Sequence, residues 1–87
     1  MKSFNLVGVD GNAFSVMAYV VNAMKEADRH DRGSLGRKTG RFNKEAQSAY
    51  QREAMSSDYN NLLCVSMNVI DDVNQYLNLE EDEDDEE

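Results

Sequence analysis

The chain has 87 residues, a formal net charge of −8 and a sequence pI of about 4.5, with one cysteine and no proline. A single cysteine excludes an intrachain disulfide and a zinc site built from several cysteines, and no stretch has the length and apolarity of a signal peptide or membrane span. A chain this short buries only about 60% of its unfolded surface, so we expect a homo-oligomer in which self-association adds stability. The lone thiol and the lack of a targeting segment are typical of a reducing cytosol.

The first residues differ from the rest of the chain in their pattern. Phe4 and Leu6 alternate with polar residues, which predicts a short extended segment over residues 2–9. Nothing else in the sequence predicts a strand. Because a lone strand leaves its backbone donors and acceptors unpaired, we expect this segment to pair with a second copy of the chain, another partner or water.

A helical pattern follows the turn-forming residues 10–12. It predicts a helix over residues 13–29, capped by Asn12 or Asp10. Apolar residues at spacings of three and four make its core-facing stripe. The members of this stripe are Phe14, Met17, Val21 and Met24, widened by Ala18 and Val20.

Two more helices complete an all-α domain over residues 1–79. One covers residues 44–56 behind the capping residue Asn43, and the other begins after Asp58 and ends near Leu79. The longer helix is expected to dominate the core, since each large apolar side chain contributes about 1.5–3 kcal/mol when buried. Its buried side is expected to contain Tyr59, Leu62, Leu63, Ser66, Ile70, Val73, Tyr76 and Leu77.

The charge is segregated along the sequence. Residues 80–87 are all acidic and carry the whole net charge, whereas residues 25–52 hold eight of the nine basic residues and a net charge of +4. Consecutive carboxylates at a helix C-terminus oppose the helix dipole and repel one another, so we predict a disordered acidic tail. Three roles stay open for it: a solubilising appendage, a mimic of a nucleic-acid backbone, or a cover for the basic region.

The basic region is predicted to be a loop over residues 30–42, in which Gly33, Gly36 and Gly40 interrupt any helix. Glycines let the backbone approach an anion, and arginine can bind phosphate oxygens in a bidentate manner. The candidate anion-binding residues are Arg32, Arg37, Lys38, Arg41 and Lys44. The stretch does not match the phosphate loop of nucleotide triphosphatases, and a solvated loop without a ligand is the alternative.

Catalysis, a metal and a cofactor find little support in the sequence. His30 is the only histidine and is expected to be a solvated loop residue. Cys64 lies among apolar residues of the third predicted helix, where we expect a buried, inert thiol. The acidic pI and the scarcity of aromatic residues in the basic region argue against binding of duplex nucleic acid. We therefore expect a binding protein and not an enzyme.

Two stretches are similar to a known group of proteins. Residues 4–14, F-N-L-V-G-V-D-G-N-A-F, and residues 53–63, E-A-M-S-S-D-Y-N-N-L-L, resemble small uncharacterised proteins of tailed bacteriophages. Those proteins tend to read F-N-L-x-G-x-D-G-N-A-F and E-A-x-S-x-D-Y-x-x-L-L. The resemblance implies a viral origin and brings no activity with it, and it covers neither the basic loop nor the acidic tail.

The sequence and the resemblance together suggest a non-catalytic phage accessory protein in the host cytoplasm. We expect it to bind and block a host or antiviral-defence protein, or to sequester a phosphate-bearing ligand such as a nucleotide through the basic loop. Two alternatives stay open: a self-assembling structural or scaffold component of the virion, and a nucleic-acid mimic that acts through the tail.

Overall fold

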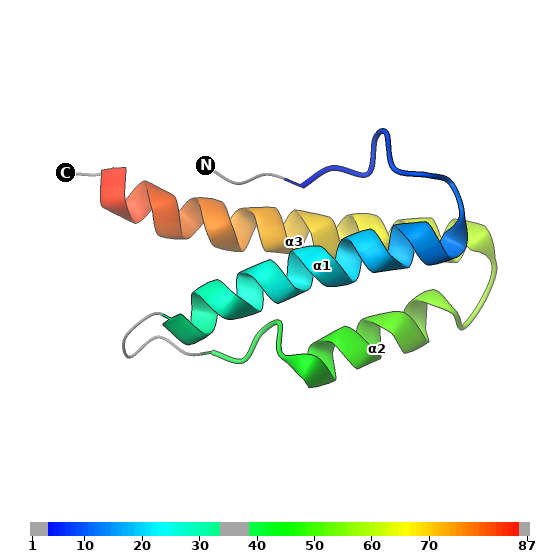
Figure 1. Ribbon diagram of the computed structural model, residues 1–87, viewed down its shortest axis with the longest axis horizontal. Helices are drawn as coiled ribbons and strands as arrows, with labels where there is room; N and C mark the ends of the chain where they lie inside the picture. Colours follow the sequence, from blue (N-terminus) through cyan, green and yellow to red (C-terminus); the bar gives the residue numbers. More distant parts are fainter. Residues whose placement is uncertain (1–3, 34–38, 86–87) are drawn as a thin grey trace.

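The computed structural model describes residues 4–33 and 39–85, with side chains described as far as Asn78. Three helices account for most of this part of the chain: α1 (Ala13–Gly33), α2 (Lys44–Ala54) and α3 (Tyr59–Asp85). Helices α1 and α3 run in the same direction, and the shorter α2 runs the opposite way beside them (Figure 1). The predicted all-α class with three helices is confirmed, and the described residues contain no strand.

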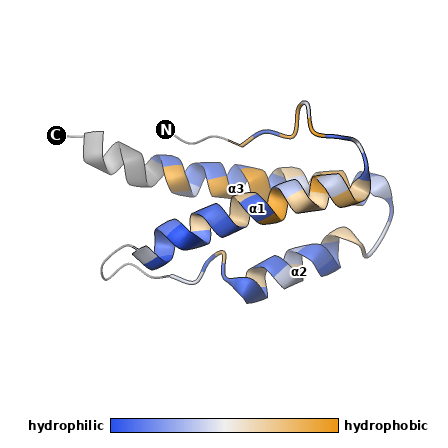
Figure 2. Ribbon diagram, in the orientation of Figure 1, coloured by the Kyte–Doolittle hydropathy of each residue, from blue (hydrophilic) through white to orange (hydrophobic). Residues whose placement is uncertain are grey.

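Helix α1 begins where the sequence predicts but ends later. Asn12 caps it, because the Asn12 side-chain oxygen accepts a hydrogen bond of 2.8 Å from the backbone N–H of Phe14. The helix continues to Gly33, so the predicted loop start at residue 30 is wrong. Figure 2 shows the reason: the second half of α1 is hydrophilic, so the apolar pattern stops before the helix does.

The buried face of α1 is also rotated from the predicted one. Met17, Val20 and Met24 of the predicted stripe are buried, but Phe14 and Ala18 are exposed, and Val16, outside the predicted stripe, is buried. Packing against two helices on one side selects the stripe that continues along the whole length of α1. Its members are Val16, Met17, Val20, Ala23, Met24, Ala27, Asp28 and Asp31.

Helix α2 is attached to the bundle by buried side chains at both ends. Asn43 caps it as predicted, accepting a hydrogen bond of 2.9 Å from the backbone N–H of Ala46. The preceding Phe42 is buried and packs edge-on against Tyr76 of α3. The Tyr50 hydroxyl lies 2.6 Å from that of Ser66, and burial raises the pKa of Tyr50 above its usual 10.0 although this hydrogen bond lowers it.

Helix α3 forms the other wall of the core. Asp58 caps it as predicted, accepting a hydrogen bond of 3.0 Å from the backbone N–H of Asn61. The buried residues Leu62, Ser66, Ile70, Val73, Tyr76 and Leu77 agree with the predicted face. Tyr59 is 42% exposed, so the buried face does not reach the first residue of α3.

The predicted end of the third helix near Glu80 is wrong, since α3 extends to Asp85. Each like-charge pair one turn apart costs only about 0.2–0.5 kcal/mol. Glutamate also has a high helix propensity, and each added residue gains a backbone hydrogen bond. Glu86 and Glu87 and the side chains from Leu79 onward lie outside the described residues, and disorder of the tail stays a prediction.

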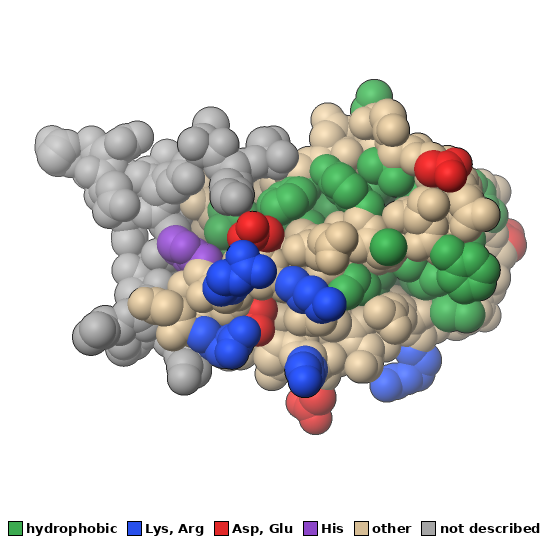
Figure 3. All heavy atoms as spheres, viewed as in Figure 1, with side chains coloured by type: hydrophobic (Ala, Val, Ile, Leu, Met, Phe, Trp, Pro, Cys, Tyr) green, Lys and Arg blue, Asp and Glu red, His purple; other side chains and the backbone are tan. Residues whose placement is uncertain are grey.

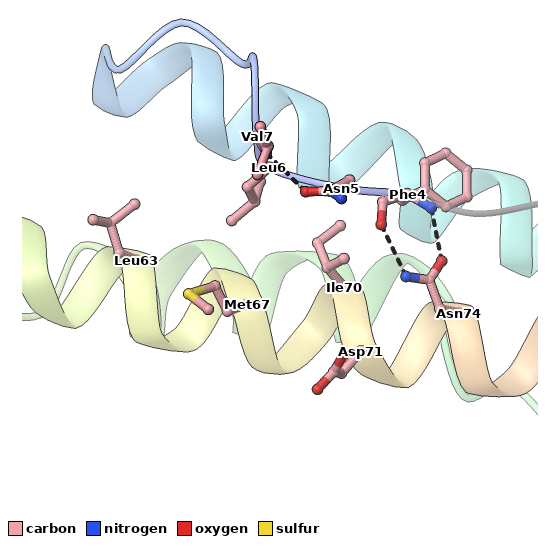
Figure 4. A pocket seen from close by; sticks show the side chains of 9 residues that line it. All are labelled: Phe4, Asn5, Leu6, Val7, Leu63, Met67, Ile70, Asp71 and Asn74. Atoms are coloured by element: carbon pink, nitrogen blue, oxygen red, sulfur yellow. Dashed lines mark hydrogen bonds between the residues drawn. The ribbon is translucent and has the colours of Figure 1, made fainter.

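The N-terminal segment is extended, but a side chain takes the place of a neighbouring strand. The amide of Asn74 accepts a hydrogen bond of 2.8 Å from the backbone N–H of Phe4 and donates one of 2.9 Å to its carbonyl, as a paired strand would do (Figure 4). The backbone N–H of Asn5 donates to the Tyr19 hydroxyl. The N–H and carbonyl of Phe4 and the N–H of Asn5 are therefore satisfied within the chain, which removes the reason for expecting these groups to pair with a second copy.

We predict that Asn74→Ala loosens this segment. Two neutral hydrogen bonds contribute about 0.5–1.5 kcal/mol each, so the free energy of unfolding should fall by about 1–3 kcal/mol. Amide hydrogen exchange at Phe4 should become faster, as measured by NMR. Asn68→Ala, on the exposed face of the same helix, is the control and should leave that exchange rate unchanged. Equal protection of Phe4 in both variants would contradict the proposed role of Asn74.

The described helices show no span long and apolar enough to cross a membrane.

Candidate interaction sites

The structure brings together two of the five predicted anion-binding residues. Arg32, near the end of α1, and Lys44, the first residue of α2, line one hollow of about 360 Å³. Arg41 lines a different hollow, between α2 and α3, and its guanidinium lies 5.5 Å from the centre of the Phe42 ring. Arg37 and Lys38 lie outside the described residues.

The hollow that contains Arg32 and Lys44 has mixed charge. Asp28 and Glu45 also line it, so its four charged side chains cancel formally. The Nε of Arg32 donates a hydrogen bond of 3.1 Å to Asp28 Oδ2, although the arginine side chain is 63% exposed. Figure 3 shows basic side chains gathered over the end of α1 and over α2, with acidic ones between them. A phosphate here would compete with carboxylates that already neutralise part of the positive charge.

Asp31 is the most highly coordinated side chain in the described part of the molecule. Its carboxylate is fully buried and accepts hydrogen bonds from the backbone N–H groups of Thr39 and Gly40, both at 2.9 Å to Oδ2. It also accepts one from the Tyr76 hydroxyl at 2.9 Å and one from the Thr39 hydroxyl at 3.2 Å. The Asp31 side chain of α1 thereby connects two other parts of the molecule. It binds residues 39–40, which lead into α2, and it binds Tyr76 of helix α3.

These hydrogen bonds decide the charge state of Asp31. Burial raises the pKa of the carboxyl, but the hydrogen bonds from Gly40, Tyr76 and Thr39 together outweigh it and hold the pKa below its ordinary 3.8. Asp31 is therefore ionised at neutral pH. Gly40 adopts a positive φ of 71°, a conformation that favours glycine and lets two successive N–H groups point at the carboxylate.

The two residues considered for catalysis lie elsewhere than expected. His30 belongs to α1 and not to a loop, and its ring packs edge-on against Tyr76 at 5.9 Å between centres. Cys64 is exposed, so the prediction of a buried thiol is wrong. The apolar residues beside it in sequence point to other faces of α3, as the helical period of 3.6 residues requires. In the described part of the chain, no group of three or more His, Cys, Asp and Glu side chains is placed to hold a metal.

The two stretches that carry the phage-protein resemblance meet at one end of the bundle. The Tyr59 hydroxyl at the start of α3 donates a hydrogen bond to the carbonyl of Gly11, 48 residues earlier. Around this contact lies an apolar hollow of about 260 Å³, which we call the motif-end hollow. Its lining residues are Ala13, Phe14, Met17, Ala54, Met55, Ser57, Asp58, Tyr59 and Leu62.

Two large apolar side chains of the motif-end hollow face solvent. Phe14 is 71% exposed and Met55 is 61% exposed. Asp10, four residues before Phe14, is exposed. Asp58 lines the hollow itself, and its lining contains no Lys or Arg. Exposed apolar side chains rimmed by polar groups are typical of protein interaction sites. Comparisons with protein-family models, curated proteins and solved structures give no match to this chain.

Sequence reasoning missed both Asp31 and the motif-end hollow. The apolar stripe at Val20, Met24 and Ala27 leads by helical spacing to position 31, so continuing that register would have placed a carboxylate in the core. The resemblance to phage proteins offered a signal for the hollow, since both of the stretches that carry it contribute residues to the lining. Phe14 is predicted to lie on the buried face of its helix, so its exposure in this hollow is not expected from the sequence.

Proposed function

We propose that this chain is a non-catalytic phage accessory protein that binds and blocks a protein of the host or of its antiviral defence. We further propose that it acts as a homo-oligomer in the host cytoplasm. The observation that carries the proposal is the motif-end hollow, where Phe14 and Met55 are exposed within or beside the stretches that resemble phage proteins. The exposed Phe14 ring gains little from packing within the chain, whereas insertion into a partner would bury it.

A phage-plating assay tests this proposal. Bacteria that carry individual antiviral defences are transformed with the gene, and plating of a defence-sensitive phage is measured. Wild type should restore plating against at least one defence, and Phe14→Ser should abolish the effect. Ala18→Ser, an exposed position one turn further along α1, is the matched control and should behave as wild type. Equal activity of both variants would argue against the motif-end hollow as the binding site.

A phosphate-bearing ligand is the second candidate, because Arg32 and Lys44 share one hollow at the N-terminus of α2. The other predicted residues, Arg37, Lys38 and Arg41, belong to the same proposal. A thermal-shift panel of inorganic phosphate, nucleotides and cyclic nucleotides tests it. A ligand at about 100 times its Kd adds about 2.7 kcal/mol, which Lys44→Ala and Arg32→Ala should reduce. Absence of any shift would argue against a phosphate-bearing ligand.

A further inference from the structure

A hollow of about 480 Å³ lies between the N-terminal segment and α3, and we call it the N-terminal groove. Residues 4–7 form one wall, and Leu63, Met67 and Ile70 of α3 form much of the other (Figure 4). Two of its apolar side chains face solvent, since Val7 is 86% exposed and Met67 is 60% exposed. Exposed apolar groups that line one hollow are typical of an interaction site, and methionine adapts to partners of different shape.

Asp71 gives the N-terminal groove its charge. It is the only Asp, Glu, Lys or Arg that lines the groove, and it is exposed. Within the described part of the chain, its carboxylate has no ion-pair or hydrogen-bond partner. A carboxylate beside apolar side chains attracts a cation more strongly than one surrounded by water, and it repels an anion. The groove therefore selects for a positive charge on whatever binds there.

The motif-end hollow has the same combination of apolar and acidic groups. Asp58, which also caps α3, is its only charged lining residue. All five large apolar side chains that are exposed in the described residues line one of these two hollows, and no Lys or Arg lines either. Leu62 lines one hollow and Leu63 the other, so both adjoin the start of α3. Two sites on one protein thus favour a partner of the same chemistry.

We propose that the N-terminal groove binds a segment of the protein partner in which apolar side chains lie next to lysine or arginine. The inference rests on the proposed function and names the chemistry of its partner. Apolar side chains of the segment cover Val7 and Met67, and its cation pairs with Asp71. Lysine and arginine suit both parts of the groove, because their methylene stems pack on apolar surface while their charged ends reach a carboxylate.

A peptide titration followed by NMR tests the chemistry of the groove. The probe is a short synthetic peptide with two leucines flanked by lysines, added to the full chain at physiological salt. It should shift the backbone amides of Val7, Met67 and Asp71. Peptides with glutamates in place of the lysines, or serines in place of the leucines, should leave these amides unshifted. Equal shifts with either control peptide would overturn the proposal.

Two further outcomes of the titration identify other binding modes. Shifts confined to the acidic residues 80–87 would mean that the peptide binds the tail through charge alone, and would overturn the groove as its site. Shifts of the groove amides that depend on protein concentration, with no peptide present, would identify a second copy as the occupant. That result would also overturn the proposal.

Charge reversal at two neighbouring positions separates the groove from the overall charge. An exposed ion pair changes affinity by up to about fivefold, and a reversed charge adds repulsion, so Asp71→Lys should raise the peptide Kd at least about fivefold. Asp72→Lys changes the net charge equally at an exposed position that lines a different hollow. It should raise the Kd less than about twofold. Equal increases would overturn the assignment to the groove, and circular dichroism checks that both variants keep the fold.

The plating assay then distinguishes this inference from the proposed function. If wild type restores plating but the peptide does not bind the groove, the inference is overturned and the proposed function stands. The same holds if Asp71→Lys restores plating as well as wild type does. If wild type blocks no defence, the proposed function fails, and the inference about its partner fails with it even where the peptide binds.

Discussion

Asp31→Asn is expected to lower the free energy of unfolding by about 3–5 kcal/mol, because hydrogen bonds to a charged group contribute about 1.5–3 kcal/mol each and several are lost. The side chain keeps its size, but only its one carbonyl oxygen can accept, so either the N–H groups of Thr39 and Gly40 or the hydroxyls of Tyr76 and Thr39 lose their acceptor. At least one buried donor is then left unpaired. For a domain of this size the midpoint of thermal unfolding should fall by at least about 12 °C, as measured by calorimetry.

The control is Asp72→Asn, which removes the same charge from an exposed position of α3. It should change stability by no more than about 0.5 kcal/mol. Tyr76→Phe keeps the ring and removes only the hydroxyl that donates to Asp31, so it should cost about 1.5–3 kcal/mol. If Asp31→Asn were as stable as Asp72→Asn, the carboxylate would not be what holds the segment that leads into α2.

The pH dependence of stability gives an independent check on Asp31. The folded protein holds the pKa of this carboxyl below the ordinary 3.8. At pH values between the folded-state pKa and 3.8, the unfolded chain therefore binds more protons than the folded protein. The stabilisation is therefore complete above pH 3.8 and is lost as the pH falls from 3.8 through the lower folded-state pKa. The difference between wild type and Asp31→Asn, measured by urea unfolding, should be constant near neutral pH and shrink below pH 3.8.

The sequence predicts the helical caps well because each is a local feature. Asn12, Asn43 and Asp58 cap the three helices as their residue types indicate. Helix ends without such a signal are predicted poorly. Gly33 ends α1 after a hydrophilic turn that no apolar pattern marks, and α3 continues into the acidic residues because repulsion there is weaker than helix propagation.

Contacts between distant residues explain the remaining differences. The alternation at Phe4 and Leu6 predicts an extended segment that needs backbone partners, and a side chain, Asn74, supplies them 70 residues later. Asp31 reads as an exposed loop residue because a lone carboxylate is costly to bury. Its burial becomes favourable only when Thr39, Gly40 and Tyr76 converge on it. The predicted anion-binding site differs for a local reason, since Asp28 lies one turn before Arg32 and Glu45 directly follows Lys44, and both carboxylates line the hollow.

A matched pair of phenylalanine substitutions separates folding from binding. Phe42 is 3% exposed and packs against Tyr76 at 5.6 Å between ring centres. Phe42→Ala should therefore lower the free energy of unfolding by about 3–5 kcal/mol, the usual cost of truncating a buried ring. Phe14 is 71% exposed, so Phe14→Ala should change it by no more than about 0.5 kcal/mol. Urea unfolding measures both values.

The comparison bears directly on the motif-end hollow. If Phe14 serves a partner, its removal should leave stability intact and abolish the defence-blocking activity that the plating assay measures. If Phe14→Ala instead destabilised the chain as much as Phe42→Ala, the ring would be part of the core in solution. Its place in the phage-like stretch would then have a folding explanation, and the hollow would lose its claim as a binding site. A stable but inactive Phe14→Ala is the result that the exposed ring requires.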